Sequence, residues 1–185
     1  MSRNYAFKNP NGLYFISFAT VHWVAVFIRD IYFQLLVESL TYCRETKGME
    51  LFAYCIMPNH VHLIFKSSTG NPSGLIRDLK KYTSKKLIQT IRTNFKESRR
   101  ERLLDMFQKA GQSKSNIAKY QFWQHHNHPI ELWSTAVIRQ KLKYIHNNPV
   151  KSGFVESPED WKYSSAANFS GKPAVLEIDE IGFLG

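Results

Sequence analysis

Two histidines stand two residues apart in the apolar segment 58–65, Pro-Asn-His-Val-His-Leu-Ile-Phe. Side chains at positions i and i+2 of a β-strand point to the same face, so a strand here projects His60 and His62 side by side and turns Val61 toward a core. Two neutral imidazoles directed at one point form half of a metal site. A pair of this kind taken alone is more often part of an ordinary, partly buried strand.

A second segment, Tyr-Ile-His-Asn-Asn-Pro at 144–149, supplies further reactive groups. Ser134 is typical of a helix N-cap, and Pro149 favours a helix end, so we expect a helix over about 134–147. Tyr144 and Asn148 are four residues apart and therefore adjacent on its surface, at the edge of its apolar face. Taken alone, the tyrosine is better explained as an amphipathic residue at the rim of the core.

The segments around these motifs alternate between strand and helix patterns. Strands are predicted over 13–21, 51–57, 60–66 and 120–130, and helices over 29–47, from about 73, and over 134–147. The order of the first six elements matches the ferredoxin-like split β-α-β pattern. We therefore predict an α+β fold, an antiparallel sheet with helices packed on one side, in a single domain spanning 1–185 with its core at about 13–169. The polar stretch 97–118 is interpreted as a helical extension or a loop insertion of open function.

The charge of the chain favours an anionic partner. The net charge is +10, and the segment 77–102 alone carries ten basic and three acidic side chains, a net +7. A solvated helix face usually mixes both signs, so this one indicates a surface for phosphates. The aromatic Trp123 is a candidate for stacking on unpaired bases. The candidate phosphate contacts are Arg77, Lys80, Lys81, Lys85, Lys86 and Arg92.

Other features exclude alternatives. Cys43 and Cys55 form no Cys-x-x-Cys motif and are interpreted as buried thiols in a reducing compartment. The apolar run 13–28 is broken by polar residues and is short for a span of about 20 residues, so we expect a cytoplasmic protein with no membrane partner. A rival cluster of histidines stands at 125, 126 and 128, where Pro129 breaks the strand. It is interpreted as a DNA-contacting or structural loop.

Together the two motifs resemble those of the IS200-like single-tyrosine transposases. The segment 58–65 resembles their His-hydrophobic-His signature, and 144–153, Tyr-Ile-His-Asn-Asn-Pro-Val-Lys-Ser-Gly, resembles the tyrosine motif of the REP-associated branch. The motifs occur in the family's order with a basic helix between them, and the resemblance spans about 13–169. The insertion-sequence branch often has glutamine as its last metal ligand, so Asn148 points to the REP-associated branch.

The resemblance implies roles for four residues. His60, His62 and Asn148 would ligate a divalent metal, Mg²⁺ or Mn²⁺, and Tyr144 would attack a phosphodiester of hairpin-bearing single-stranded DNA. The products would be a 5′-phosphotyrosine and a free 3′-hydroxyl, which later reverses the step without ATP. Imidazoles alone suit Zn or Cu, so Mg²⁺ or Mn²⁺ needs the amide, water and phosphate oxygens as well. A homodimer with shared sites and a self-contained monomer both fit the sequence.

Two other functions fit the same residues. A non-catalytic module that binds single-stranded nucleic acid would keep its binding after chelation and form no covalent adduct. A replication-initiator type nickase would nick an origin within a multidomain protein. The chain contains no obvious helicase part, which counts against the nickase.

Overall fold

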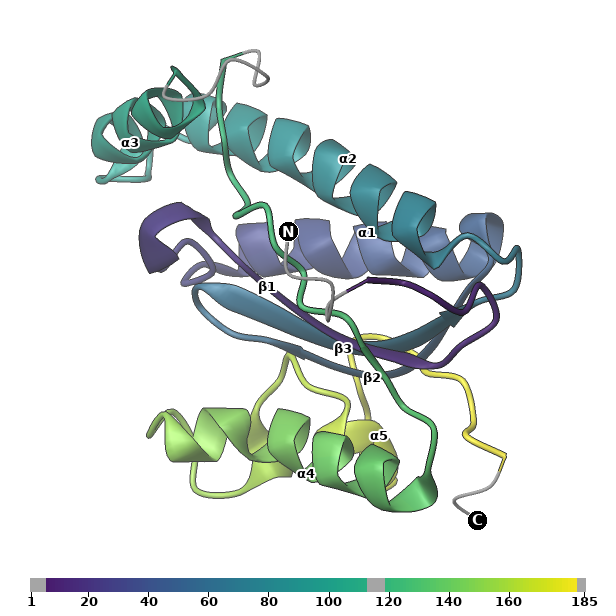
Figure 1. Ribbon diagram of the computed structural model, residues 1–185. Helices are drawn as coiled ribbons and strands as arrows, with labels where there is room; N and C mark the ends of the chain where they lie inside the picture. The colour runs from purple at the N-terminus through teal and green to yellow at the C-terminus, as the bar shows by residue number, and fades with distance from the viewer. Residues whose placement is uncertain (1–5, 113–118, 183–185) are drawn as a thin grey trace.

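The computed structural model describes residues 6–112 and 119–182, and its centre is a four-stranded antiparallel sheet (Figure 1). The strands lie in the order β2-β3-β1-β4, and β3 is antiparallel to both of its neighbours. Strands β1 and β2, which flank β3, therefore run parallel, as a split β-α-β unit requires. The predicted α+β, ferredoxin-like fold is confirmed. The strands are β1 (Tyr14–Ala19), β2 (Met49–Ile56), β3 (His60–Ser67) and β4 (Ile130–Glu131).

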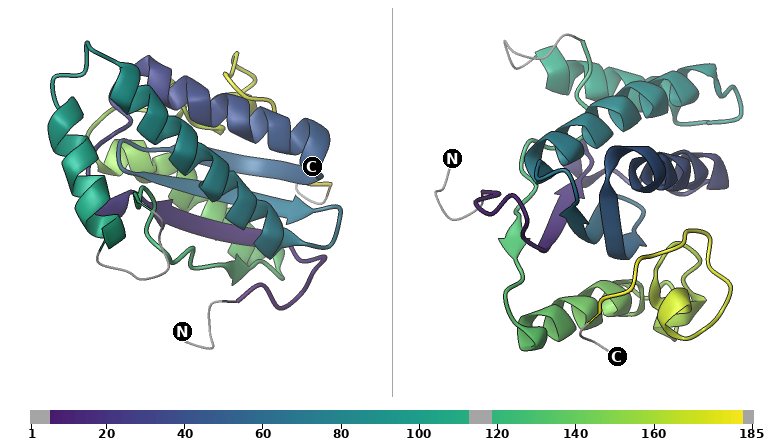
Figure 2. Two further views of the ribbon diagram at one scale, coloured as in Figure 1. Left: turned by 90° about the horizontal axis from the view of Figure 1, so that it is seen from above. Right: turned by 90° about the vertical axis from the view of Figure 1, so that its right-hand side faces the viewer.

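Helices cover both faces of this sheet. Helices α1 and α2 lie over one face, and α4 and α5 lie under the other (Figures 1 and 2). The prediction that the helices pack on one side is therefore wrong. The four long helices are α1 (Asp30–Lys47), α2 (Pro72–Thr93), α3 (Arg100–Gln112) and α4 (Thr135–Lys151); the short ones are η1 (Val21–Trp23), η2 (Pro158–Asp160) and α5 (Ala166–Phe169).

The central strands explain why one layer of helices is not enough. In β3, Leu63 and Phe65 belong to the apolar cluster that includes α1 and α2, whereas Ile64 belongs to the cluster under α4. A strand that is apolar on both faces needs cover on both faces. His62 alternates with Val61 and Leu63, so it points to the α4 side. The two faces thus separate the histidine pair from α1 and α2.

The segment predicted as a strand over 120–130 is mostly irregular. It pairs with β1 through the short β4, and an isolated bridge joins Trp123 to Thr20, the residue that follows β1. Between them, single hydrogen bonds such as Gln124 N–H to the Ala19 carbonyl hold the chain along the edge of β1. Upstream, α3 accounts for part of the polar stretch 97–118, and residues 113–118 lie outside the described residues.

Helix α4 begins as predicted and ends later. The Ser134 hydroxyl accepts a hydrogen bond from Val137 N–H at 3.3 Å, which confirms the N-cap. The helix continues to Lys151, with Pro149 inside its last turn. A proline near the end of a helix removes a single donor, and Ser152 N–H still reaches the Asn148 carbonyl at 3.1 Å. The additional turn keeps Asn148 in helical register with Tyr144.

A buried carboxylate ties the α1 face together. The Glu97 side chain is fully buried and accepts hydrogen bonds from Arg29 Nε at 3.1 Å and Arg99 Nε at 2.9 Å. Burial raises the pKa of this carboxyl, but the hydrogen bonds and charges of the two arginines outweigh it and lower the pKa to about 2. The Glu97 carboxyl therefore stays ionised in the folded protein at pH values at which the same carboxyl is protonated in the unfolded chain.

Glu97→Gln is expected to lower the free energy of unfolding by about 2–3 kcal/mol at pH 7. A carboxyl whose pKa falls on folding stabilises the protein above its unfolded pKa and loses that effect as the pH drops toward the folded value. Urea unfolding should thus show that the variant and the wild type differ less in free energy of unfolding at pH 4 than at pH 7. Glu101→Gln, at a side chain 92% exposed, is the control. An equal loss at both pH values would contradict this account.

Two further expectations concern the thiols and the membrane. Cys43 and Cys55 are both free and buried, as predicted, and burial raises their pKa values to about 11 and about 12. Within residues 6–112 and 119–182, no helix has the length and apolar character needed to cross a membrane.

Candidate active site

The two histidines of β3 lie together under the sheet. Their ring centroids are 4.7 Å apart, and the rings are nearly perpendicular. His62 is 2% exposed and sits opposite Ser17 of β1 and Cys55 of β2, in the middle of the sheet. The Phe15 ring stacks against it at 5.7 Å. The strand period thus places both imidazoles on one face, at the end of β3 where Pro58 and Asn59 turn the chain.

Helix α4 brings the tyrosine and the asparagine to the same place. The amide nitrogen of Asn148 lies 3.3 Å from His62 Nε2, and the Tyr144 ring centroid lies 5.2 Å from that of His62. Tyr144 is 42% exposed, so its ring is open to an incoming molecule. Residues from positions 60 to 148 therefore meet within one chain. His146 turns away and contacts Ser165 at 2.9 Å.

Hydrogen bonds fix the orientation of the His60 ring. The Asn59 amide nitrogen donates to the Trp23 carbonyl at 3.1 Å, which leaves its carbonyl oxygen facing His60 Nδ1 at 2.7 Å. An oxygen of this kind only accepts, so Nδ1 carries the proton and Nε2 keeps its lone pair. A metal-bound histidine is usually oriented in this way, by a partner on its other nitrogen.

Burial keeps both rings neutral at pH 7. It lowers the pKa of His60, and it lowers that of His62 to about 3, with the charges of His60 and Lys141 adding to the effect. A neutral imidazole is the form that binds metal. His62 Nδ1 is buried with no hydrogen-bond partner among the described residues. The Asn148 amide lies against the other ring nitrogen, Nε2.

Three neutral side chains of the site could hold a divalent cation. His60 and His62 offer imidazole nitrogens, and a half-turn of the Asn148 amide presents its oxygen where the nitrogen now lies. Among the described residues, no group of three or more His, Cys, Asp or Glu side chains is placed to hold a metal. Three neutral donors leave room for water and for the phosphate oxygens that Mg²⁺ prefers. The rings of His126 and His128 lie 5.8 Å apart and form no such group either.

Lys141 belongs to the site and was missed from the sequence. Its ammonium lies 4.8 Å from the Phe15 ring centroid and 5.6 Å from that of Tyr144. No carboxylate in the described ranges forms an ion pair with it. Lys141 could have been predicted from its position three residues before Tyr144, because residues i and i+3 of a helix lie on the same face. The ammonium is placed to stabilise negative charge beside the tyrosine.

The candidate phosphate contacts divide into two groups on α2. Arg77, Lys81, Lys85 and Arg92 are exposed, and helical geometry places them in one outward stripe, called here the basic stripe. Lys86 points elsewhere, with its ammonium 5.7 Å from the Tyr82 ring centroid. The whole helix lies on the opposite side of the sheet from Tyr144 (Figure 1).

Two of the predicted DNA contacts are wrong. Trp123 is 5% exposed and packs in the core, where its ring nitrogen donates to the Thr83 hydroxyl at 3.0 Å. It cannot stack on a base without unfolding that core. The Lys80 ammonium turns inward and donates to the Gln124 carbonyl at 2.8 Å and to the Asn127 side chain. Burial lowers the pKa of Lys80 to about 8, so this lysine anchors the edge segment instead of a phosphate.

Comparison with known proteins decides the family. Residues 16–108, half of the chain, match the family described as Transposase IS200 like. The chain belongs to the IS200-like transposase family. The predicted family is thus confirmed, and with it the class of enzyme, a tyrosine transposase that cleaves and transfers DNA strands. The matched range includes the histidine pair and ends before α4.

Two relatives of this transposase are similar to it over more of the chain than the family match covers. A Haemophilus influenzae protein, provisionally named a REP-associated tyrosine transposase, is 28% identical over 156 residues, covering 83% of this chain and 79% of that protein. The REP-associated tyrosine transposase of Escherichia coli K12 is 25% identical over 135 residues, covering 72% of this chain and 64% of the relative's length. A solved structure of a REP-associated tyrosine transposase bound to a REP hairpin shares the fold, with a TM-score of 0.63 at 18% identity over 98% of this chain and 92% of that one.

Proposed function

We propose that this transposase cleaves and rejoins hairpin-bearing single-stranded DNA through a 5′-phosphotyrosine at Tyr144, with a divalent metal held by His60, His62 and Asn148. The observation that carries the proposal is the meeting of α4 and β3, with the Tyr144 ring 5.2 Å from His62 and the Asn148 amide 3.3 Å from it. The hairpin as substrate is supported by the related structure, which holds a REP hairpin.

The chemistry follows from what the phenol can do. The Tyr144 oxygen forms a bond to phosphorus as the bond from phosphorus to the 3′ oxygen breaks, and the leaving oxygen takes up a proton. The number of phosphodiester bonds stays constant, so the reverse step needs no ATP. Mg²⁺ or Mn²⁺, held by His60, His62 and Asn148, would supply Lewis acidity to the reacting phosphate. The phenol loses its proton as it attacks, and Lys141 lies where it can stabilise the negative charge that develops.

Affinity comes from a different surface. The basic stripe of Arg77, Lys81, Lys85 and Arg92 is suited to the phosphates of a hairpin stem, because such contacts give affinity and orientation without reading sequence. Since α2 and α4 lie on opposite faces of the sheet (Figure 2), the contacts to the stem phosphates and the cleavage site lie on separate surfaces. Variants of one surface should therefore leave the function of the other largely intact.

Labelling each end of the DNA in turn tests the proposal. The protein is incubated with Mn²⁺ and a hairpin that carries a single-stranded flank, and the products are separated on a denaturing gel. A 3′ label should move to the protein, and a 5′ label should appear on a shorter free strand, because the tyrosine keeps the 5′ phosphate. Chelation should remove both products. Binding that persists under chelation with neither product would favour the non-catalytic binding module, and cleavage without attachment would refute the tyrosine intermediate.

A further inference from the structure

A strained turn holds an exposed tryptophan beside the histidine pair. His22 and Trp23, in η1 directly after β1, have φ values of 54° and 55°, in the left-handed region that residues other than glycine rarely adopt. Such a conformation is strained for a residue that carries a Cβ atom. The turn is held by Trp23 N–H, which donates to the Thr20 carbonyl at 3.0 Å, and by the Asn59 amide on the Trp23 carbonyl. The indole is nevertheless 56% exposed.

The indole is close to the histidine pair and also lines a cavity. On one side its ring centroid is 5.7 Å from that of His60, in an edge-on arrangement. On the other side it lines a cavity of about 570 Å³ between η1, α3 and the segment 121–126. None of the described lining residues is acidic, and the one lysine, Lys109, is paired with Asp105 at 2.8 Å. The polar groups that line the cavity are the imidazoles of His22, His125 and His126 and the amides of Gln121 and Gln124.

Hydrogen bonds hold two of the side chains that line the cavity. The Gln124 amide donates to the Thr20 carbonyl at 3.0 Å, and the Gln121 amide donates to the Trp123 carbonyl at 3.1 Å. An aromatic face beside imidazole and amide groups is the kind of surface on which unpaired bases stack and are read. A site formed in advance loses little free energy to ordering when it binds.

We infer that Trp23 and this cavity bind a nucleobase next to the phosphate that Tyr144 attacks. The inference rests on the proposed function, since it assigns one base of the same single-stranded substrate. Proximity supports it, because the indole touches the His60 ring. Stacking on Trp23 would hold the flanking nucleotide and so place the phosphate beside the histidines. It also explains why a large aromatic residue occupies a backbone conformation that suits glycine.

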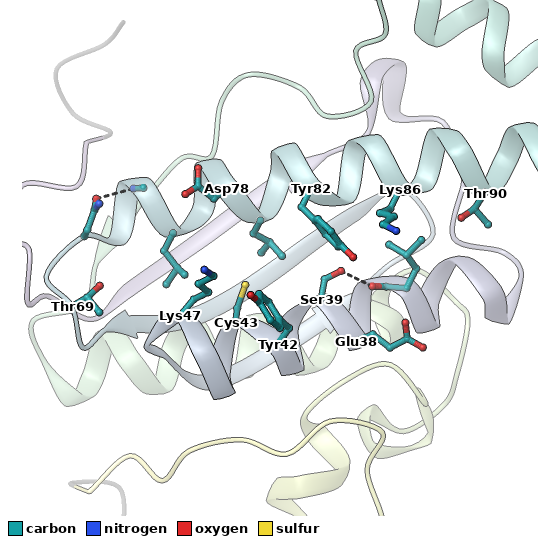
Figure 3. Close-up of a pocket in the computed structure, with 15 residues that line it drawn as sticks. Glu38, Ser39, Tyr42, Cys43, Lys47, Thr69, Asp78, Tyr82, Lys86 and Thr90 are labelled. Atoms are coloured by element: carbon teal, nitrogen blue, oxygen red, sulfur yellow. Dashed lines mark hydrogen bonds between the residues drawn. The ribbon is translucent and has the colours of Figure 1, made fainter.

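A larger cavity, between α1 and α2, fits this role less well. A cavity of about 900 Å³ lies between α1 and α2, and Figure 3 shows Tyr42 and Tyr82 along it. Its lining mixes Lys47 and Lys86 with the acidic Glu38 and Asp78. Carboxylates repel a phosphate backbone. This larger cavity also lies on the α1 and α2 face of the sheet, away from Tyr144 (Figure 1).

Fluorescence of 2-aminopurine tests the inference. The probe is the hairpin with its single-stranded flank, carrying one 2-aminopurine that is moved along the flank, and the protein carries Tyr144→Phe so that the DNA stays whole. One position next to the phosphate cut by the wild type should be quenched on binding. Trp23→Ala should abolish that quenching and weaken binding about tenfold. Trp133→Ala, at another exposed tryptophan (80%) outside the cavity, should change neither.

A second variant separates stacking from folding. Trp23→Gly relieves the left-handed strain, so it should unfold at or above the wild-type temperature and still lose the quenching. Quenching that survives in both Trp23 variants would overturn the inference. The proposed function is judged separately by adduct formation of the protein with an intact Tyr144. An adduct together with unchanged quenching would refute the base site alone.

Discussion

Tyr144→Phe is expected to abolish the covalent adduct with hairpin DNA and to leave affinity for the hairpin within about twofold of wild type. The substitution removes the attacking oxygen and keeps the ring that packs against Phe15 and His62. Loss of a nucleophile lowers turnover by about 10³-fold or more. The basic stripe on α2 is untouched, so phosphate contacts persist. The measurement is transfer of a 3′ label to protein, with affinity measured separately by anisotropy.

A matched tyrosine provides the control. Tyr82 is also a half-exposed tyrosine on a helix, 53% exposed, but it lies on α2. Tyr82→Phe should form the adduct at the wild-type rate. If Tyr144→Phe still becomes labelled, the nucleophile is a different residue, and peptide mapping of the adduct would identify it.

Replacing both histidines, His60→Ala with His62→Ala, is expected to remove cleavage in Mn²⁺ to the level seen after chelation. Both rings are held neutral by burial, and the removal of both leaves only the Asn148 amide of the proposed donors. Cleavage should fall by at least about 10²-fold, the scale at which electrostatic groups act on a developing charge. Titration of Mn²⁺ by calorimetry, after subtraction of the heat of Mn²⁺ binding to DNA alone, should show binding to wild type in the presence of DNA and none to the variant.

Removing a buried histidine also affects folding, so a second histidine variant is needed as a control. His146 is a partly buried neutral histidine two residues from Tyr144 that contacts Ser165. His146→Ala should keep metal-dependent cleavage when rates are expressed per folded protein. A double variant of His60 and His62 that cleaves at the wild-type rate with Mn²⁺ would exclude these residues as the metal site.

Much of the candidate site follows from two local periods in the sequence. The period of two along β3 places His60 and His62 on one face, and the spacing of four on α4 places Tyr144 and Asn148 on adjacent turns. Both relations hold within a single element, so no tertiary information is needed. The meeting of these two elements was expected from the family resemblance, and the structure shows it within one chain.

What the sequence does not reveal depends on packing between elements. Trp123 looks like an aromatic residue on a basic protein, and only the contact of its segment with β1 and α2 buries it. Lys80 belongs to the basic run but turns inward to the edge segment. The conformation of Trp23 has no sequence signal, because left-handed turns are recognised by glycine or asparagine. The second layer of helices covers the apolar residues on the other face of β3, and it is seen only once α4 and α5 are packed there (Figure 1).

The joining of α4 to β3 in one chain has a consequence for the order of events. Ile138, Leu142 and Ile145 pack α4 against the sheet, so the phenol and the histidine pair of one chain meet without help from a second copy. On the proposed chemistry each molecule then owns a single attachment point and can hold one DNA end at a time. Exchange between two ends is therefore sequential, and the first scission is a unimolecular property of the bound complex that dilution leaves unchanged.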